Sequence, residues 1–163
     1  MKRTELTVLL LIALFLAPLS QALQAQAPRR YHPGEIYQAI QQLNFLGSAL
    51  YVAAHPDDEN TRLIAYLANE QKARTAYLSL TRGDGGQNLI GPEIRELLGV
   101  LRTQELLAAR RIDGGSQMFT RANDFGYSKT PAETMEIWNR DEVLSDVVWA
   151  IRKWRPDIIV NRL

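Results

Sequence analysis

Short apolar runs alternate with longer amphipathic stretches along most of this chain. The apolar runs are predicted to be strands, and they are Leu46 to Ala54, Ala73 to Leu80, Gln117 to Arg121 and Pro156 to Val160. The stretches between them are predicted to be helices, and they are Glu59 to Gln71, Pro92 to Arg111, and Thr134 to Trp154 with a break near Asn139. This alternation predicts an α/β fold with a mostly parallel sheet.

The first residues have the pattern of a secretory signal peptide. Lys2 and Arg3 precede an almost wholly apolar run from Leu6 to Leu19, and small residues follow it. The apolar run is short for a membrane span, although an uncleaved N-terminal anchor is the alternative interpretation. Cleavage after Ala22 would leave a tether and a short amphipathic helix, predicted over Glu35 to Leu46, that packs onto the domain. We therefore predict a signal peptide over 1–22, a tether and short helix over 23–45, a domain over 46–163, and a secreted or periplasmic location.

Composition restricts the chemistry that the chain can carry. The sequence has no cysteine, so a metal ion would be held by His, Asp or Glu, which favours zinc or a harder divalent cation. Its 163 residues include 19 basic and 18 acidic side chains, a net charge of +1 that gives no basis for binding nucleic acid or an anionic membrane. The only histidines are His32, in the tether, and His55.

The five residues His55-Pro56-Asp57-Asp58-Glu59 directly follow the first predicted strand. Parallel sheets bind their ligands at the carboxyl ends of their strands. An imidazole and a carboxylate are ordinary zinc ligands, and a second carboxylate can take a proton from a bound water. The alternative is a strand-to-helix turn in which Pro56 starts the helix and the acids lie on its positive N-terminal dipole. Glu59 in particular fits a helix start or a supporting contact to the site.

A glycine-rich loop, Thr81 to Asn88, follows the second predicted strand. It lacks the spacing of a dinucleotide-binding fingerprint. Arg82 is the best candidate for a substrate contact, because a guanidinium can bind sugar hydroxyls or a phosphate; an ion pair with Asp84 or Glu105 is the alternative. Asn88 could bind a hydroxyl or simply form a turn.

Three motifs resemble the PIG-L/LmbE-like family of zinc-dependent N-acetylglucosaminyl deacetylases. They are Ala54 to Glu59, Leu80 to Gly86, and Gly99 to Leu106, which is similar to the family's Gly-x-x-Arg-x-x-Glu-Leu helix. The first motif is highly specific and the other two are supportive. The resemblance covers about Leu46 to Leu163 and implies a Rossmann-like three-layer fold that is truncated at its C-terminus.

The resemblance also implies roles for individual residues. His55 and Asp58 match two zinc ligands, and Asp57 matches the general base that activates the zinc-bound water. The implied reaction removes an acetyl group from an N-acetylglucosamine-type glycan or small molecule. Arg102 and Glu105, one helical turn apart, would pair with each other or brace the site.

The chain departs from the family pattern at the third zinc ligand. In the family this ligand is a histidine in a segment after the last strand predicted here, and no such residue follows Val160. Catalytic zinc sites normally have three protein ligands. Two alternatives therefore stay open: a catalytically incomplete carbohydrate-binding or interaction domain, and an amidase that acts on a different N-acyl substrate.

Overall fold

A computed structural model of the chain describes residues 30–162. The predicted signal peptide and most of the tether lie outside the described residues. The short helix is present as α2, Pro33–Gln42, and none of its residues is buried. Its packing onto the domain stays a prediction. Within residues 30–162, no helix is long and apolar enough to cross a membrane.

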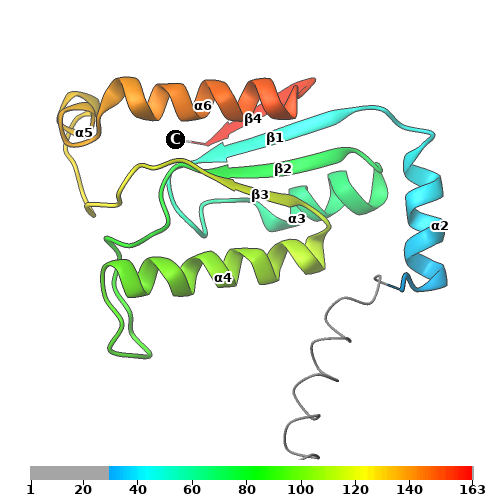
Figure 1. Cartoon of the computed structure of the whole chain (residues 1–163), viewed down its shortest axis with the longest axis horizontal. Coiled ribbons are helices and arrows are strands. Elements are labelled where there is room, and N and C mark those ends of the chain that lie inside the picture. Colours follow the sequence, from blue (N-terminus) through cyan, green and yellow to red (C-terminus); the bar gives the residue numbers. More distant parts are fainter. Residues whose placement is uncertain (1–29, 163) are drawn as a thin grey trace, which may run out of the picture. The chain divides into compact units, whose positions relative to one another are not determined.

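Four strands form one sheet in the order β3-β2-β1-β4. They are β1 (Ser48–Ala53), β2 (Arg74–Ser79), β3 (Ser116–Phe119) and β4 (Ile158–Arg162). All three pairings are parallel, with Leu50 opposite Ala76 on one side and Ile159 on the other. The predicted α/β class is confirmed. Because every strand runs the same way, the loops after them emerge at one edge of the sheet (Figure 1).

The helices lie close to their predicted positions, but the second half of the helix predicted over Glu59 to Gln71 is a π-helix. They are α3 (Thr61–Ala65), the π-helical turn η1 (Tyr66–Glu70), α4 (Glu96–Asp113), α5 (Pro131–Ile137) and α6 (Arg140–Trp154). The break near Asn139 is confirmed, since the Asn139 side chain accepts a hydrogen bond from the Glu142 backbone and caps α6. Gly114 ends α4 with a φ of 80°, a left-handed conformation that glycine adopts without strain.

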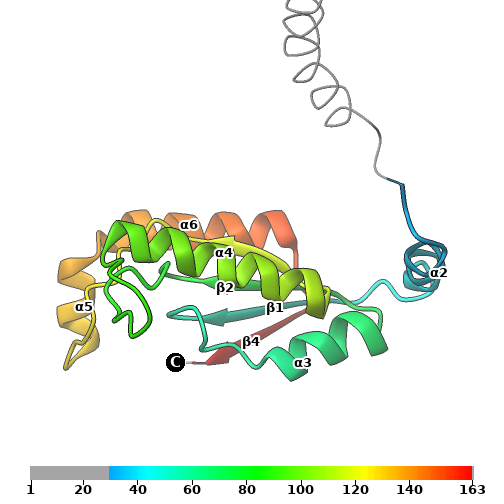
Figure 2. The same ribbon diagram turned by 90° about the horizontal axis from the view of Figure 1, so that it is seen from below.

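The sheet is covered on both faces, as the views in Figures 1 and 2 show. On one face Tyr51 and Tyr77 pack with Ile64 of α3 and Leu106 of α4. On the other face Leu50 and Leu78 pack with Ala150 of α6. These two apolar clusters give the α-β-α layering of a Rossmann-like three-layer fold and hold the strand ends in place.

The buried face of α4 differs from the pattern that its leucines suggest. Leu98 and Leu106 are buried, but Leu97 and Leu101 are 65% and 41% exposed. The sequence also predicts a helix from Pro92, whereas α4 begins at Glu96. The helix instead buries two charged residues near its C-terminal end, Arg110 and Asp113. A pattern of apolar residues cannot reveal such a face.

A side-chain contact joins the starts of β1 and β4. The carboxylate of Asp157, just before β4, accepts hydrogen bonds from the Ser48 backbone N–H and hydroxyl, both at 2.8 Å. The Asp157 N–H in turn donates to the Ser48 carbonyl at 3.0 Å. The hydroxyl and the N–H of Ser48 hold the pKa of Asp157 below its usual value.

Leu50→Ala should lower the free energy of unfolding by about 2–5 kcal/mol, because it opens a cavity in a strand that is covered on both faces. Leu50 is fully buried, whereas Leu89 is 93% exposed. Urea unfolding followed by circular dichroism measures the effect. Leu89→Ala is the control and should change stability by less than about 0.5 kcal/mol. Equal effects of the two changes would contradict the core described here.

Asp157→Asn should destabilise the protein at pH 7 and have progressively less effect as the pH falls below about 4. The pKa of Asp157 is lower in the folded than in the unfolded state. Its carboxylate therefore stabilises the fold above the unfolded-state pKa, and this contribution is lost as the pH falls through the folded-state pKa. Unfolding curves between pH 3 and 7 measure the difference, with Glu136→Gln, an exposed residue of α5, as the control. A difference that is independent of pH would rule out this linkage.

Candidate active site

His55 and Asp58 lie next to each other in the tight turn after β1. The Asp58 Oδ2 accepts a hydrogen bond from the His55 backbone N–H at 2.9 Å and lies 3.3 Å from the His55 Nδ1. Both side chains remain accessible, at 40% and 36% exposed. The Arg162 guanidinium, at the end of β4, donates to the Asp58 carbonyl at 2.8 Å and so ties the turn to the neighbouring strand.

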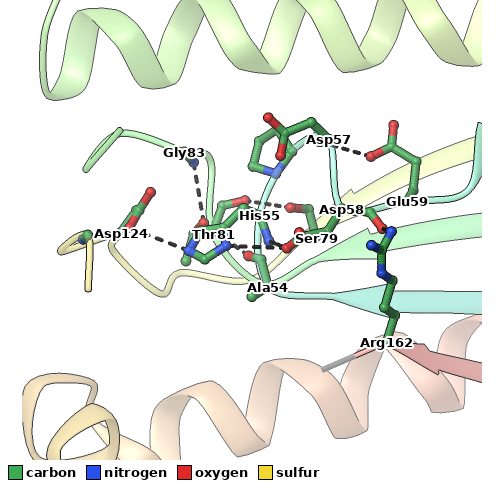
Figure 3. A network of polar contacts seen from close by, with 12 residues as sticks. Ala54, His55, Asp57, Asp58, Glu59, Ser79, Thr81, Gly83, Asp124 and Arg162 are labelled. Carbon is green, nitrogen blue, oxygen red and sulfur yellow. Dashed lines mark hydrogen bonds and ion pairs between the residues drawn. The ribbon is translucent and has the colours of Figure 1, made fainter. Parts of the chain in front are cut away.

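A third acidic residue reaches the same imidazole from a distant part of the chain. The Asp124 Oδ1 lies 3.6 Å from the His55 Nε2, and the Asp124 side chain is only 6% exposed. Figure 3 shows Asp58 and Asp124 on opposite sides of His55. No sequence pattern assigns Asp124 a role beyond a place in a loop that could line the cleft. The only signal that could have found it is its position after β3, whose carboxyl end neighbours that of β2.

Asp57 lies in the same turn but faces a different partner. Its Oδ2 accepts a hydrogen bond from the Arg102 Nη2 at 2.7 Å, so its side chain is directed toward α4 and away from the imidazole (Figure 3). The same Arg102 nitrogen also donates to the Pro56 carbonyl at 3.1 Å. The Arg102 Nε also lies 3.7 Å from the Glu105 Oε2. Arg102 thus pairs with Glu105 and also braces the turn, the two roles predicted for it.

The backbone of Asp57 has a φ of 82°, a left-handed conformation that a residue with a side chain adopts at a cost. The Glu59 Oε2 accepts a hydrogen bond from the Asp57 N–H at 2.9 Å in this conformation.

Glu59 itself does not serve the helix start. The N-cap of α3 is Asn60, which accepts from the Leu63 N–H, and the helix begins at Thr61 rather than at Pro56 or Glu59. A competing cap residue one position later explains the difference.

Tyr77 holds the backbone of His55. Its hydroxyl donates a hydrogen bond to the His55 carbonyl. Burial raises the pKa of Tyr77, because the phenolate would lose its hydration, so the hydroxyl stays protonated and remains a donor. The ring packs edge-on against Tyr51, with centroids 5.9 Å apart. The position of His55 is thus fixed by the core of the sheet.

The glycine-rich loop after β2 packs against both of the other loops. Thr81 is buried, and its backbone N–H and hydroxyl donate to the Ala54 carbonyl at 2.9 and 3.0 Å. A Cβ on Gly85 would lie 2.3 Å from the Asp124 carbonyl oxygen. Only glycine at this position allows the loop to approach the backbone that carries Asp124.

Arg82 and Asn88, the two predicted substrate contacts, each bind other groups of the protein in this structure. The Arg82 guanidinium lies 4.2 Å from the centre of the Phe119 ring, and its Nη1 donates to the Thr103 hydroxyl at 3.0 Å. It therefore pairs with neither Asp84 nor Glu105. The Asn88 Oδ1 accepts from two backbone N–H groups, those of Ile90 and Gly91. Asn88 thus forms a turn here, and hydroxyl binding by either residue stays a prediction.

A cavity of about 410 Å³ opens beside His55. Its wall is largely apolar and includes Leu80, Phe125 and Trp138, while Asp124 contributes a carboxylate. Phe125 and Trp138 meet edge to face, with ring centroids 6.1 Å apart. Arg82 lines a separate cavity of about 360 Å³ with Asp84 and Thr103. A small molecule in the first cavity would contact the imidazole directly.

The donors in the turn suit zinc in their chemistry. His55 and Asp58 offer an imidazole nitrogen and a carboxylate oxygen on an accessible surface. Among residues 30–162, no group of three or more His, Cys, Asp or Glu side chains is arranged to hold a metal ion. The described residues therefore supply two of the expected ligands and do not bring a third to them.

Comparison with known proteins places these features in a family. Residues 50–161 match the family PIG-L, GlcNAc-PI de-N-acetylase. The chain belongs to the PIG-L family. The match covers the three motifs of the site and all four strands, except the first two residues of β1 and the last residue of β4. Comparison with curated protein sequences finds no match for this PIG-L chain.

One similar solved structure is that of GalB, the 4-carboxy-2-hydroxymuconate hydratase from Pseudomonas putida KT2440. The TM-score is 0.53 at 24% sequence identity, and the similarity covers 70% of this chain and 46% of that one. A likeness at this identity shows the fold alone. This PIG-L chain spans about half the length of GalB.

Gly85→Ala should displace the loop that carries Asp124, because the added Cβ would overlap a backbone carbonyl. We expect a loss of about 1–3 kcal/mol in unfolding free energy and a change in the imidazole ¹⁵N shifts of His55. Gly86→Ala, in the same loop, is the matched control, since its nearest new contact lies at 3.2 Å. His55 shifts that are identical in both variants would refute a close packing of these loops at the site.

Proposed function

We propose that this PIG-L chain is a zinc-dependent N-deacetylase that hydrolyses the acetamide of an N-acetylated amino sugar. The observation that carries the proposal is the turn after β1, in which His55 and Asp58 lie side by side with Asp57 between them in sequence. Membership of a family described as GlcNAc-PI de-N-acetylases supports the same reaction. The cavity beside His55 offers room for a small substrate or for the end of a glycan.

His55 and Asp58 are the residues that would hold the metal. Zinc, when bound, would polarise the acetamide carbonyl and make a water molecule more acidic. The Asp58 carboxylate already accepts a hydrogen bond from the His55 N–H, so the two donors are held close together before any ligand arrives. The Asp124 carboxylate lies 3.6 Å from the other ring nitrogen, where it would favour the imidazole orientation that places an Nε2–H toward it.

Asp57 is the proposed general base. Its side chain is 70% exposed, so it can rotate from Arg102 and accept a proton from water beside the turn. After the amide carbon–nitrogen bond breaks, the same carboxyl group would return that proton to the departing amine. The ion pair with Arg102 defines a resting position for the base, 2.7 Å from the guanidinium, from which this movement starts.

The location proposed for this reaction is outside the cytoplasm. The basic, apolar and small residues of the first 22 positions support export, and an N-acetylated glycan of a cell surface is a substrate of the right chemistry. Cell fractionation with an antibody to the domain would test this part of the proposal separately from activity.

The test of the function is acetate release by the zinc-loaded chain from N-acetylglucosamine and its glycosides. The wild type should release acetate, and a panel of longer N-acyl amines would show whether another amide is preferred. Normal zinc binding without acetate from any N-acetylated amino sugar would overturn the proposal. Glycan binding without turnover, unchanged in Asp57→Ala, would favour a carbohydrate-binding domain instead.

Two variants separate metal binding from proton transfer. Asp57→Asn should leave zinc affinity within about threefold of the wild type and lower kcat by on the order of 10²- to 10⁴-fold, because only the base is lost. His55→Ala should weaken zinc binding at least about tenfold, since it removes a ligand. Isothermal titration and acetate assays measure the two effects. If Asp57→Asn retained full activity, Asp57 would not be the base.

A further inference from the structure

A buried network of charges connects α4 to the turn that carries the proposed site. Arg110, near the end of α4, is 4% exposed at its side chain. Its Nη2 lies 3.2 Å from the Glu59 Oε1 and 2.6 Å from the Asp113 Oδ2. The Glu59 and Asp113 side chains are 3% and 7% exposed. Three ionised groups are thus removed from water together.

Stability alone is a poor explanation for such a network. The desolvation of buried charges often cancels their attraction, and apolar replacements of similar volume are frequently as stable. The two acids on Arg110 also differ in what else they bind. Asp113 accepts from the Gly115 N–H at 2.9 Å and so remains within the end of α4. Glu59 has its second oxygen on the Asp57 N–H, at 2.9 Å.

Glu59 binds the backbone N–H of Asp57, a residue with a strained backbone conformation. Asp57 has a φ of 82°, and a non-glycine residue in this region is held there only by its surroundings. The Glu59 carboxylate accepts the N–H of this strained residue, and Arg110 fixes the carboxylate by its other oxygen. A negative acceptor makes a stronger hydrogen bond than a neutral one.

The same arginine supports a second point of the turn. Its guanidinium carbon lies 5.5 Å from the centre of the Tyr77 ring, and the Tyr77 hydroxyl donates to the His55 carbonyl. Arg110 therefore acts on the backbone at His55 through Tyr77 and on the backbone at Asp57 through Glu59. The backbones of the proposed ligand and the proposed base are both connected to one buried cation.

We propose that Glu59 is a positioning residue: anchored by Arg110, it holds the Asp57 backbone in its left-handed conformation and so directs the proposed base. This inference rests on the proposed function for its catalytic consequence. Its structural part, the hold of Glu59 on Asp57, stands on the contacts alone. Glu59 is not a catalytic residue, since both of its oxygens are occupied inside the protein.

The test compares two variants that each remove one negative charge from Arg110. In Glu59→Gln the amide oxygen is drawn to Arg110, so the amide nitrogen faces the Asp57 N–H and the hydrogen bond is lost. In Asp113→Asn the side-chain oxygen can still accept from Arg110, and Asp57 is untouched. Both should lower the melting temperature. Only Glu59→Gln should speed hydrogen exchange at the Asp57 amide, by about tenfold or more, because the bond that protects it is gone.

Turnover gives a second readout. Glu59→Gln should lower kcat by on the order of 10- to 100-fold with little change in KM, since a misplaced base slows chemistry without weakening binding. Asp113→Asn should keep kcat near the wild-type value. In an Asp57→Asn background, Glu59→Gln should have no further effect on kcat, because a residue that acts through Asp57 has nothing left to position.

Three outcomes are decisive. Unchanged exchange at the Asp57 amide in Glu59→Gln would overturn the inference even if the wild type is an active deacetylase. Equal losses of kcat in Glu59→Gln and Asp113→Asn would show a merely structural role. If the wild type releases no acetate, the proposed function fails, while the exchange experiment still decides whether Glu59 holds Asp57. Should Glu59→Gln not fold, Glu59→Asp keeps the charge but is one methylene too short to reach both partners, and the same increase in exchange is expected.

Discussion

The parallel pairing of β1 with both of its neighbours is the constraint on which the rest of the structure depends. β1 lies between β2 and β4, and all of these strands end at the same edge. That geometry brings together the turn after β1, the glycine-rich loop after β2 and the loop after β3. His55 and Asp124 therefore lie close together although they are 69 positions apart in the sequence. The apolar clusters on both faces keep the strand ends fixed, so the loops begin from a rigid sheet.

The site is organised by its connections to buried groups. The Tyr77 hydroxyl donates to the His55 carbonyl, and the neighbouring Ala54 carbonyl accepts two hydrogen bonds from Thr81. Asp57, by contrast, has an exposed side chain on a constrained backbone. A fixed turn for the proposed ligands and a mobile side chain for the proposed base would suit hydrolysis, because metal donors must keep their geometry while a base follows the proton.

Much of this arrangement is predictable from sequence. The strands follow from short apolar runs, and the grouping of His55 with two carboxylates follows from their closeness in sequence after a strand. The pairing of His55 with Asp58 follows from the resemblance to the family. Three features could not be predicted. Asp124 approaches His55 only through the sheet topology, and no local pattern marks it. Arg110 reads as an ordinary basic residue of a last helical turn, although it is buried with two acids. Leu97 and Leu101 fit an apolar stripe, but packing against the sheet selects another face of α4.

The left-handed backbone at Asp57 has a consequence for how this chain can change. Glycine would adopt a φ of 82° without strain, so replacing Asp57 would relieve about 1 kcal/mol or more of conformational cost. Stability and chemistry thus favour different residues at this one position. A chain that kept this fold without the proposed base could carry glycine at position 57 at no cost in backbone strain, so glycine there would mark the loss of that proposed role.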